Sequence, residues 1–280
     1  MKVSIVLPTY NGERFISESI DSIICQTYEN WELIIVNDCS KDNTLRVIED
    51  YLIREPRIRL VNNEINKKLP ASLNIGFSHA TGDYLTWTSD DNICHKDYLE
   101  TLVSELSNGY DFVYSDYNVI DEYGKFKRTQ IVSEPKRIIE YNVVGASFMY
   151  TRFVYEFVGN YDINLFLLED YDYWLRVVRC MKAKKVPKVL YSYREHSDSL
   201  SGKRHDEIQE KLINYFVCNF EYNSLFFTKP QLSDAIASQL ARCIKLRNKK
   251  LAIRIIKLAV TFGLLSVVKS IFIKVFYKNA

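Results

Sequence analysis

Residues 3–44 read VSIVLPTYNGERFISESIDSIICQTYENWELIIVNDCSKDNT, and this stretch decides the fold. Val3–Leu7 is a short, almost wholly apolar run that ends at Pro8, which is typical of a strand buried on both faces. Apolar residues then recur with helical spacing over Phe15–Ile24, and Leu33–Val36 is a second buried strand. This order predicts two parallel strands joined by a helix.

The same pattern continues along the chain. A second helix starts after Ser40 or Asp42, since either residue suits an N-terminal cap. Ile58–Val61 is a third strand, Pro70–Ala80 is a helix, and Tyr84–Trp87 is a fourth strand. Strands alternating with helices over about ninety residues predict a doubly wound α/β sheet.

After the fourth strand the pattern changes. Phe112–Ile120 indicates a strand and Glu122–Lys125 a hairpin turn, so we expect antiparallel pairing here. Ser147–Tyr150 is another strand, and Asp170–Met181 is another helix. From His205 onward the apolar spacing is helical throughout. The sequence therefore predicts an α/β sheet with an antiparallel part, followed by a C-terminal α-helical region.

The composition is that of a globular protein with an uneven charge distribution. The 280 residues are 47% hydrophobic and 26% charged, with a net charge of +2. These values exclude a disordered or collagen-like chain and any strong global attraction to nucleic acid. Residues 1–234 carry a net charge of −8, whereas residues 235–280 carry ten bases and no acids. The two parts therefore call for separate interpretation.

Cysteine spacing and the N-terminus both bear on the cellular compartment. The six cysteines are scattered without a CxxC spacing, which predicts neither a zinc knuckle nor a small disulfide framework. The apolar run before Pro8 is too short for the core of a secretory signal. Both features favour a cytoplasmic protein.

Polar side chains follow three of the predicted strands. Pro8–Asn11 comes after the first strand, Asp38 after the second and Asp90–Asp91 after the fourth. Open α/β sheets bind ligands at this edge, beyond the carboxyl ends of their strands. Adjacent aspartates repel each other, and Mg²⁺ or Mn²⁺ with phosphate oxygens relieves the repulsion. The alternative is that Asp38 and Asp91 cap the helices that follow them.

The opening stretch resembles the start of family 2 glycosyltransferases, which have the GT-A fold and transfer a sugar from a nucleotide diphosphate with inversion. The resemblance continues to about residue 202 through motifs in the family's order: NNEIN, NIGFSHATGDYLTWTSDDN, GASFMYTRFVYEFVGNYD, LEDYDYWLR and YREHSDSLS. It implies a Rossmann-like, mostly parallel sheet with a small antiparallel sheet on the acceptor side. We expect a catalytic domain over 1–204, with a nucleotide-binding half (1–92) and an acceptor-binding half (93–204), and a helical region over 205–280.

The resemblance assigns the donor site residue by residue. The implied donor-binding residues are Pro8, Thr9, Tyr10, Glu13, Asp38, Asn66, Ser89 and Asp90. Asp38 would accept a hydrogen bond from the base, usually uracil, and Asp90 would lie near the ribose. Asp91 would bind the metal, Mn²⁺ or Mg²⁺. The family often has Asp at the position of Thr88, so one carboxylate of its DxD region is missing here.

Basic side chains are the candidates for contact with the diphosphate. Around Asn66 the chain departs from the family pattern NxGxxxARNxG at Lys67 and Lys68. These lysines either substitute for the family's arginine or are solvated loop residues. The YREH segment implies that Arg194 and His196 meet the metal or the leaving diphosphate, with His196 as a metal ligand. A structural histidine is the alternative.

Glu169–Asp170 resembles the family's ED motif, whose Asp is the general base. An acceptor hydroxyl must lose its proton while it attacks the anomeric carbon. Asp170 lies near a helix N-terminus, where the dipole helps to keep a carboxylate ionised, and Trp174 lies on the same helical face. Glu169 and Trp174 are candidates for acceptor or diphosphate contacts, and Asp172 is the rival base. The alternative is that these acids are only favourable charges at a helix start.

The basic C-terminal segment runs from Arg242 to Lys278. Its longest uncharged run, Leu258–Val268, has 11 residues, well short of the roughly 20 that span a bilayer. A cationic, apolar and helical segment suits the surface of an anionic cytoplasmic leaflet. The alternative is a helical subdomain packed on the catalytic core. Its high apolar content argues against nucleic acid as a partner.

These observations predict a metal-dependent inverting glycosyltransferase that is peripheral on the inner face of the cell membrane. We expect a nucleotide-diphosphate donor, a UDP-sugar, and a saccharide or lipid-linked saccharide acceptor in cell-surface polysaccharide synthesis. The alternative function is a catalytically inactive, nucleotide-sugar-binding partner subunit of a polysaccharide assembly complex.

Overall fold

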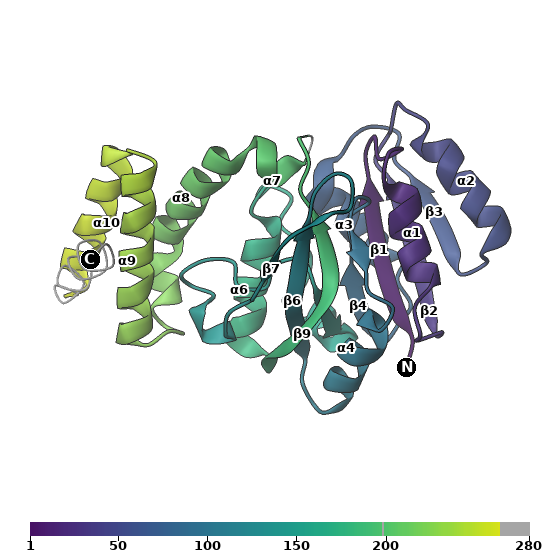
Figure 1. The fold of residues 1–280 in the computed structure, drawn as a ribbon. Helices are drawn as coiled ribbons and strands as arrows, with labels where there is room; N and C mark the ends of the chain where they lie inside the picture. Colours follow the sequence, from purple (N-terminus) through teal and green to yellow (C-terminus); the bar gives the residue numbers. More distant parts are fainter. Residues whose placement is uncertain (198, 264–280) are drawn as a thin grey trace. The chain divides into compact units, whose positions relative to one another are not determined.

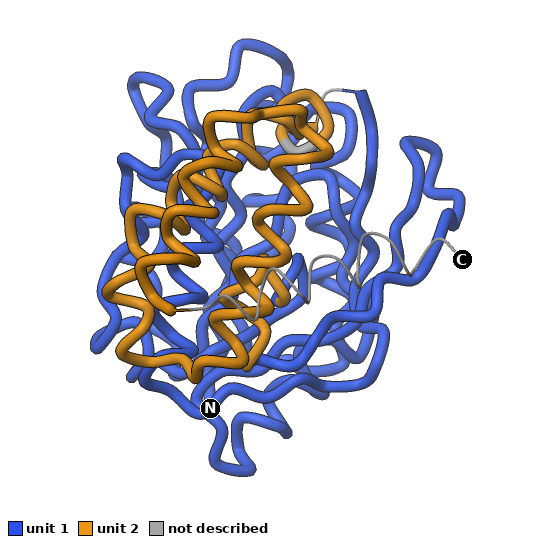
Figure 2. The backbone as a smooth tube through the Cα atoms, turned by 90° about the vertical axis from the view of Figure 1, so that its left-hand side faces the viewer, with its two compact units in different colours: residues 1–135, 144–197 blue, residues 136–143, 198–280 orange. Residues whose placement is uncertain are grey.

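The computed structural model describes residues 1–197 and 199–263. The chain divides into two compact units, which Figure 2 shows in separate colours. Unit 1 comprises residues 1–135 and 144–197, and unit 2 comprises residues 136–143 and the described part of 198–280. All six cysteines are free thiols in this structure.

Unit 1 is built on a mixed sheet to which nine of the described strands belong (Figure 1). The strands are β1 (Val3–Thr9), β2 (Trp31–Asn37), β3 (Ile58–Asn62), β4 (Tyr84–Trp87), β5 (Ile93–Cys94), β6 (Phe112–Ile120), β7 (Phe126–Gln130), β8 (Phe148–Thr151) and β9 (Ala183–Arg194). Their order is β3-β2-β1-β4-β8-β6-β9-β5, and β7 pairs with β6.

Helices cover both faces of this sheet. One face carries α1 (Ile16–Ile24), α2 (Thr44–Arg54) and α4 (Tyr98–Ser107), and the other carries α3 (Lys68–Ser78), α5 (Arg152–Val158) and α6 (Glu169–Cys180). A single 3₁₀ turn, η1 (Pro135–Arg137), follows β7. Figure 1 shows α1 and α3 on opposite sides of β1. This two-sided cover is what a doubly wound sheet requires.

The parallel half of the sheet confirms the strands predicted from the opening sequence. β1 lies between β2 and β4 in parallel, and β2 pairs in parallel with β3. Every residue of β1 and β2 is buried, because alternate side chains enter cores on opposite faces. Ile5 and Leu7 join the core beneath α1, whereas Val6 faces Gly76 of α3. The carboxyl ends of these strands therefore meet along one edge.

The antiparallel pairs extend the same sheet instead of forming a separate one. β8 pairs antiparallel with β4 and with β6, and the predicted hairpin joins β6 to β7. β9, which the sequence analysis did not anticipate, lies parallel to β6. Its middle contains Pro187, and the register jumps from Val186 opposite Ser115 to Val189 opposite Asp116. This bulge accommodates a proline that would otherwise interrupt the ladder.

Unit 2 is helical, as the sequence predicts. It contains α7 (Leu200–Lys203), α8 (His205–Asn223), α9 (Lys229–Lys245) and α10 (Lys249–Thr261). Ile213 and Phe220 of α8, Ala235 of α9 and Ile255 of α10 share one buried core, which Ile139 joins from the segment 136–143. Over residues 1–197 and 199–263, no helix combines the length and apolar character needed to cross a membrane. The end of the predicted basic tail, residues 264–280, lies outside the described residues.

Candidate active site

Thr9, Gly12 and Asp90 meet at the carboxyl edge of the sheet, just beyond β1 and β4. Thr9 Oγ1 donates a very short hydrogen bond to Asp90 Oδ2. A Cβ atom on Gly12 would lie 2.2 Å from the same carboxylate oxygen, so only glycine allows this approach. Burial and then the negative charge of Asp91 raise the pKa of Asp90 to about 7. The edge therefore holds two crowded carboxylates in a poorly solvated place.

The Asp91 turn is held by the end of β9. His196 Nε2 lies 3.0 Å from Asp91 Oδ2, and Arg194 Nε donates to the Asp91 carbonyl at 2.8 Å. The backbone N–H of Arg194 donates to Asn92 Oδ1 at 2.8 Å. The His196 ring packs against Phe15 with centroids 5.1 Å apart. The YREH segment thus fixes both the main chain and the side chain of Asp91.

Arg194 is buried and acts within the protein. Its guanidinium also donates to the Glu122 carbonyl at 3.3 Å and to Glu18 Oε2 at 2.8 Å, and it lies 4.6 Å from the Phe15 ring. Only 1% of its surface is exposed, so the cation positions Asp91 and does not point into solvent toward a ligand. Phe15, Glu18 and Asn92 are parts of this arrangement that the sequence analysis missed.

Asp38 closes the neighbouring part of the edge. Its Oδ1 accepts hydrogen bonds from Asn63 Nδ2 and the Lys67 backbone N–H, both at 2.8 Å, and its Oδ2 accepts one from the Lys68 N–H at 2.9 Å. Lys68 has a left-handed φ of +68°, and Asn66 Oδ1 lies 3.2 Å from the same Lys68 nitrogen. Asp38 therefore caps the start of α3. The capping alternative from the sequence had Asp38 cap α2, the helix that directly follows it in the chain.

The loops after β1 and β2 are tied together beside Asp38. Glu13 Oε2 accepts hydrogen bonds from the backbone and side-chain nitrogens of Asn43, at 2.7 and 2.9 Å. Asn11 Oδ1 accepts one from the Lys41 N–H at 2.8 Å. Tyr10, between them, is 49% exposed. An exposed aromatic ring on a fixed loop is suited to contact with a planar base.

Asp170 lies on the other side of the sheet edge, at the second residue of α6. Its Oδ1 accepts a hydrogen bond from the Tyr171 N–H at 2.6 Å. Burial and then the neighbouring Tyr193, whose ring centroid lies 6.2 Å from that of Tyr117, raise the pKa of Tyr117 to about 12. The Tyr117 ring is packed closely against Gly145, where an added Cβ would lie 2.4 Å from it. Tyr117 and Gly145 are further residues that sequence analysis missed.

The other acids of α6 are engaged within the chain. Asp172 forms an ion pair with Arg176 at 2.9 Å, and Arg176 also donates to the carbonyls of Val158, the last residue of α5, and Asn160. Glu169 is buried and accepts a hydrogen bond from the Leu167 N–H at 2.6 Å. The pair with Arg176 gives Asp172 a structural role in holding α6.

Trp174 belongs to the core and not to the surface of the site. Its ring lies flat on Phe112, with centroids 4.8 Å apart, and 4.4 Å from Phe148. None of its side chain is exposed. In this structure Trp174 supports α6 from beneath and does not reach an acceptor.

The model of glycosyl transferase family 2 matches residues 4–158, which is more than half of the chain. The chain belongs to glycosyl transferase family 2. Its relatives include the putative glycosyltransferase EpsE of Bacillus subtilis, which is 34% identical over 78% of this chain and 82% of EpsE. Another is the Escherichia coli UDP-Glc:alpha-D-GlcNAc-diphosphoundecaprenol beta-1,3-glucosyltransferase WfgD, which is 30% identical over 75% of this chain and 83% of WfgD.

Solved structures share the architecture of this family 2 glycosyltransferase. The mannosyltransferase PcManGT of Pyrobaculum calidifontis, in complex with GDP-Man and Mn²⁺, has a TM-score of 0.66 at 18% identity, covering 99% of this chain and 82% of that one. S. aureus TarS 1–349 in complex with UDP-GlcNAc has a TM-score of 0.65 at 18% identity, covering 88% and 73%. At this identity the likeness shows the fold, and it confirms the predicted GT-A class.

In this glycosyltransferase, the position of the missing carboxylate faces the core. Thr88 is buried, and its hydroxyl lies 2.6 Å from the Tyr191 hydroxyl. Asp90 and Asp91 are therefore the carboxylates of this segment that lie at the edge. Ser89, between these positions, accepts a hydrogen bond from Ser19 through its carbonyl.

The Asp91 carboxylate fits a hard divalent cation. Its Oδ1 is buried and receives no hydrogen bond from the described residues, although an ionised oxygen in such a place needs a partner. No three His, Cys, Asp or Glu side chains of the described chain form a complete metal cage. Phosphate oxygens of a donor would be the natural remaining ligands.

Proposed function

We propose that this family 2 glycosyltransferase is a metal-dependent inverting enzyme that moves a sugar from a UDP-sugar to a saccharide or lipid-linked saccharide during cell-surface polysaccharide synthesis. One observation carries the proposal: Asp91 is fixed by His196 and Arg194, with a buried oxygen left without a hydrogen-bond partner, next to the Thr9–Asp90 pair. An anchored carboxylate with one oxygen that has no partner among the described residues, at the ligand edge of an α/β sheet, is suited to a metal-bound diphosphate.

The nucleoside would lie along the loops that follow β1 and β2. Pro8–Glu13 supplies one wall, with the exposed ring of Tyr10, and Asp38 supplies the other. A carboxylate has about four acceptor positions, and Asp38 uses three of them for Asn63 Nδ2 and the Lys67 and Lys68 N–H groups, so one remains for an N–H of the base. Ser89 and Asp90 would contact the ribose. The donor of the relative WfgD, UDP-Glc, supports uridine as the nucleoside.

The diphosphate would lie nearest to Asp91. A divalent cation, Mn²⁺ or Mg²⁺, would be held by Asp91 and supply positive charge to the departing diphosphate. His196 would complete or orient this set, because its Nε2 already contacts the carboxylate. Lys67 and Lys68 are exposed cations at the start of α3 and are suited to the same phosphates.

Asp170 would be the general base. The acceptor hydroxyl must give up its proton as it attacks the anomeric carbon, and a carboxylate within hydrogen-bond reach accepts it. Asp170 lies in the first turn of α6, where the helix dipole favours its ionised form. Tyr117 and Gly145 would form the floor on which the acceptor hydroxyl is presented.

The C-terminal helices would hold the enzyme at the cytoplasmic face of the membrane. α10 buries one side in unit 2 and exposes Ile253, Ile256 and Val260, which are 54%, 48% and 58% exposed. Lys250 and Lys257 are exposed on the same helix. An apolar stripe flanked by lysines is suited to the interface of an anionic leaflet. A lipid-linked acceptor, such as the GlcNAc-diphosphoundecaprenol acceptor of WfgD, would be presented there.

The decisive experiment uses the full chain with Mn²⁺, a panel of UDP-, GDP- and dTDP-sugars, and diphosphate-lipid-linked saccharides. We expect release of one nucleoside diphosphate together with a lengthened acceptor, and loss of both in excess chelator. If no donor is bound or turned over, the proposal is wrong. Calorimetric UDP binding without transfer to any acceptor would instead favour the inactive partner subunit, for which the missing carboxylate at Thr88 is the supporting observation.

A further inference from the structure

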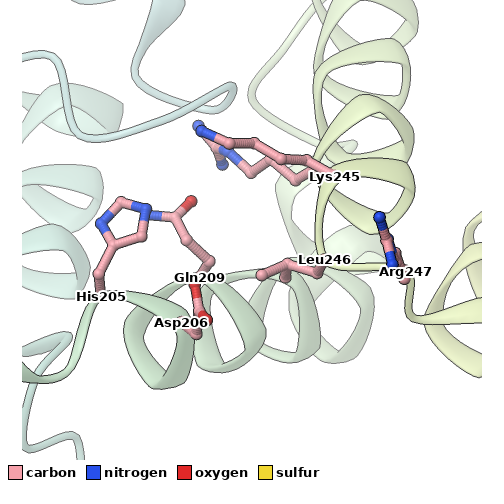
Figure 3. Close-up of a pocket in the computed structure, with 7 residues that line it drawn as sticks. His205, Asp206, Gln209, Lys245, Leu246 and Arg247 are labelled. Carbon is pink, nitrogen blue, oxygen red and sulfur yellow. The ribbon is translucent and has the colours of Figure 1, made fainter.

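Unit 2 contains an open pocket with a volume of about 330 Å³. It lies between the first turns of α8 and the end of α9 with the connection to α10 (Figure 3). His205 and Gln209 project from α8, and Lys245 extends toward them from α9. The polar side chains that line it are His205, Asp206, Gln209, Arg242, Lys245 and Arg247. All of them belong to one compact unit.

The lining of this pocket is strongly cationic. Arg242, Lys245 and Arg247 contribute three positive charges, whereas Asp206 contributes a single negative one. Arg242 Nη1 donates to Gln239 Oε1 at 3.2 Å, which helps to fix that guanidinium. Within the described chain, neither Lys245 nor Arg247 forms an ion pair. The pocket therefore has an excess of positive charge that a multivalent anion would neutralise.

Arg247 occupies a backbone position that favours glycine. Its φ is +52°, and its N–H donates to the Ile244 carbonyl while the Asn248 N–H donates to the Cys243 carbonyl. These two bonds define a Schellman motif at the end of α9, with Arg247 in its left-handed position. Glycine is the usual residue there because a side chain strains the left-handed conformation. Because Arg247 lines the pocket, we infer that its side chain is retained at this position for a contact made there.

The walls of the pocket are tied together by Asn248. Its Oδ1 accepts a hydrogen bond from the Leu251 N–H at 3.1 Å and so caps α10. Its Nδ2 donates to Glu210 Oε1 on α8 at 2.9 Å. The connection that carries Arg247 is thus fixed to the helix that carries His205, so the cations are preorganised.

We propose that this pocket binds a phosphate or diphosphate group. Phosphate carries more charge than a carboxylate and offers several acceptor oxygens, which match converging lysine and arginine side chains. The first turn of α8 has no side-chain cap, and a helix N-terminus favours an anion. The source is either a free phosphate compound or the head group of a membrane lipid. This site lies in unit 2 and does not depend on the proposed transfer reaction.

The test measures binding of inorganic phosphate and pyrophosphate to the full chain by calorimetry, and binding to phosphatidylcholine vesicles that contain phosphatidic acid. The same vesicles with an equal charge of phosphatidylglycerol report non-specific attraction. Arg247→Gly and Lys245→Ala remove cations from the pocket. The matched control is Lys229→Ala, which removes an exposed cation from the start of α9, outside the pocket.

We expect saturable binding of pyrophosphate, of phosphatidic acid vesicles in preference to phosphatidylglycerol, or of both. Either pocket variant should weaken it roughly tenfold, whereas Asp206→Asn should strengthen it by removing the opposing charge. Arg247→Gly should not lower the thermal unfolding temperature, because glycine suits the left-handed position. Binding only to vesicles identifies a lipid head group, and binding in solution identifies a free anion. Absence of saturable binding to every probe, or equal weakening in the lysine control, would overturn the proposal.

Discussion

At the scale of single residues, the structure gives two neighbouring acids different surroundings. Asp170 and Asp172 lie two residues apart at the start of α6, where Asp172 is paired with Arg176 and Asp170 accepts a hydrogen bond from the Tyr171 N–H. Sequence alone offered both as bases. We propose Asp170 as the base because it occupies the Asp position of the ED motif, and the ion pair with Arg176 accounts for Asp172.

Asp170→Asn should lower the rate of sugar transfer by about 10² to 10⁴, the usual contribution of a general base. Binding of the nucleotide measured by calorimetry should be unchanged, because the proposed role of Asp170 is to accept the proton of the acceptor and not to bind the donor. The matched control is Asp172→Asn, which weakens the pair with Arg176 and should lower the unfolding temperature more than it lowers transfer. Retained transfer in Asp170→Asn would reassign the base.

Individual roles in the site could be predicted from sequence only in part. The positions of Asp38, Asp90 and Asp91 at strand ends follow from the α/β pattern, and the structure places all three along one edge. The partners of these residues could not be predicted, because they come from distant segments. Arg194 was expected near a ligand, but its contacts with Asp91, Glu18 and Glu122 require β9 to end beside that turn.

At the scale of elements, the start of β2 depends on one buried carboxylate. Glu32 is 2% exposed and accepts hydrogen bonds from Lys2 Nζ, Ser4 Oγ and the backbone and side chain of Thr81. Arg59 of β3 also contacts it. Burial acts to raise the pKa of Glu32, but these hydrogen bonds outweigh it and lower the pKa from 4.5 to about 2.

The low pKa of Glu32 makes the folded state sensitive to acid. A carboxylate whose pKa is lowered on folding stabilises the protein fully above about pH 4.5, and this stability is lost as the pH falls toward 2. The contribution is about 2 to 3 kcal/mol. Denaturant unfolding from pH 6 to pH 3 should therefore show a falling free energy of unfolding. In Glu32→Gln the free energy of unfolding should be lower at pH 6 and should fall less between pH 6 and pH 3. Exposed Glu49→Gln should reproduce the parent curve, and an unchanged slope in Glu32→Gln would refute the assignment.

Packing of α3 on the sheet depends on the missing side chain of Gly76. A Cβ atom there would lie 2.3 Å from Val6 Cγ1 and 3.1 Å from Val36 Cγ2. Alanine is favoured over glycine in a helix by about 1 kcal/mol, but overpacking a core costs about 1 to 3 kcal/mol. Gly76→Ala should therefore lower the free energy of unfolding. Ser78→Ala, on the exposed side of the same helix, should change it little. A stabilised Gly76→Ala protein would show that the helix can move away from β1.

Some helices and strands could be predicted from the sequence, and others could not. β1, β2 and α1 follow from their apolar periodicity, and the structure confirms them. β9 did not follow, because Pro187 lies in its middle and the lysines around it break the alternation expected of a strand. The bulge that lets β9 pair with β6 depends on tertiary structure, so no local sequence pattern predicts it.

At the scale of the whole molecule, the uneven charge corresponds to the division into units. The acids around the donor edge lie in unit 1, whereas the bases of α9 and α10 lie in unit 2. A truncation after Asp234 would end the chain within α9 and remove Ile236 and Ile255 from the core of unit 2. The role of the basic segment is therefore better tested by substitutions on the exposed face of α10 than by truncation.

Exposed apolar residues of α10 should control binding to anionic membranes. In Ile253→Ser with Ile256→Ser, partitioning of the full chain onto phosphatidylcholine vesicles that contain phosphatidylglycerol should fall at least about tenfold, since each lost side chain removes apolar area from the interface. Sedimentation with the vesicles at low salt measures this effect. The matched control is Ile53→Ser with Ile163→Ser, which are 85% and 61% exposed in unit 1. Added salt should weaken the parent's binding, because lysines supply part of the attraction. The membrane role would be refuted if the parent protein did not bind these vesicles at low salt, or if the control variant lost as much vesicle binding as the α10 variant. The charge division would then serve packing within unit 2.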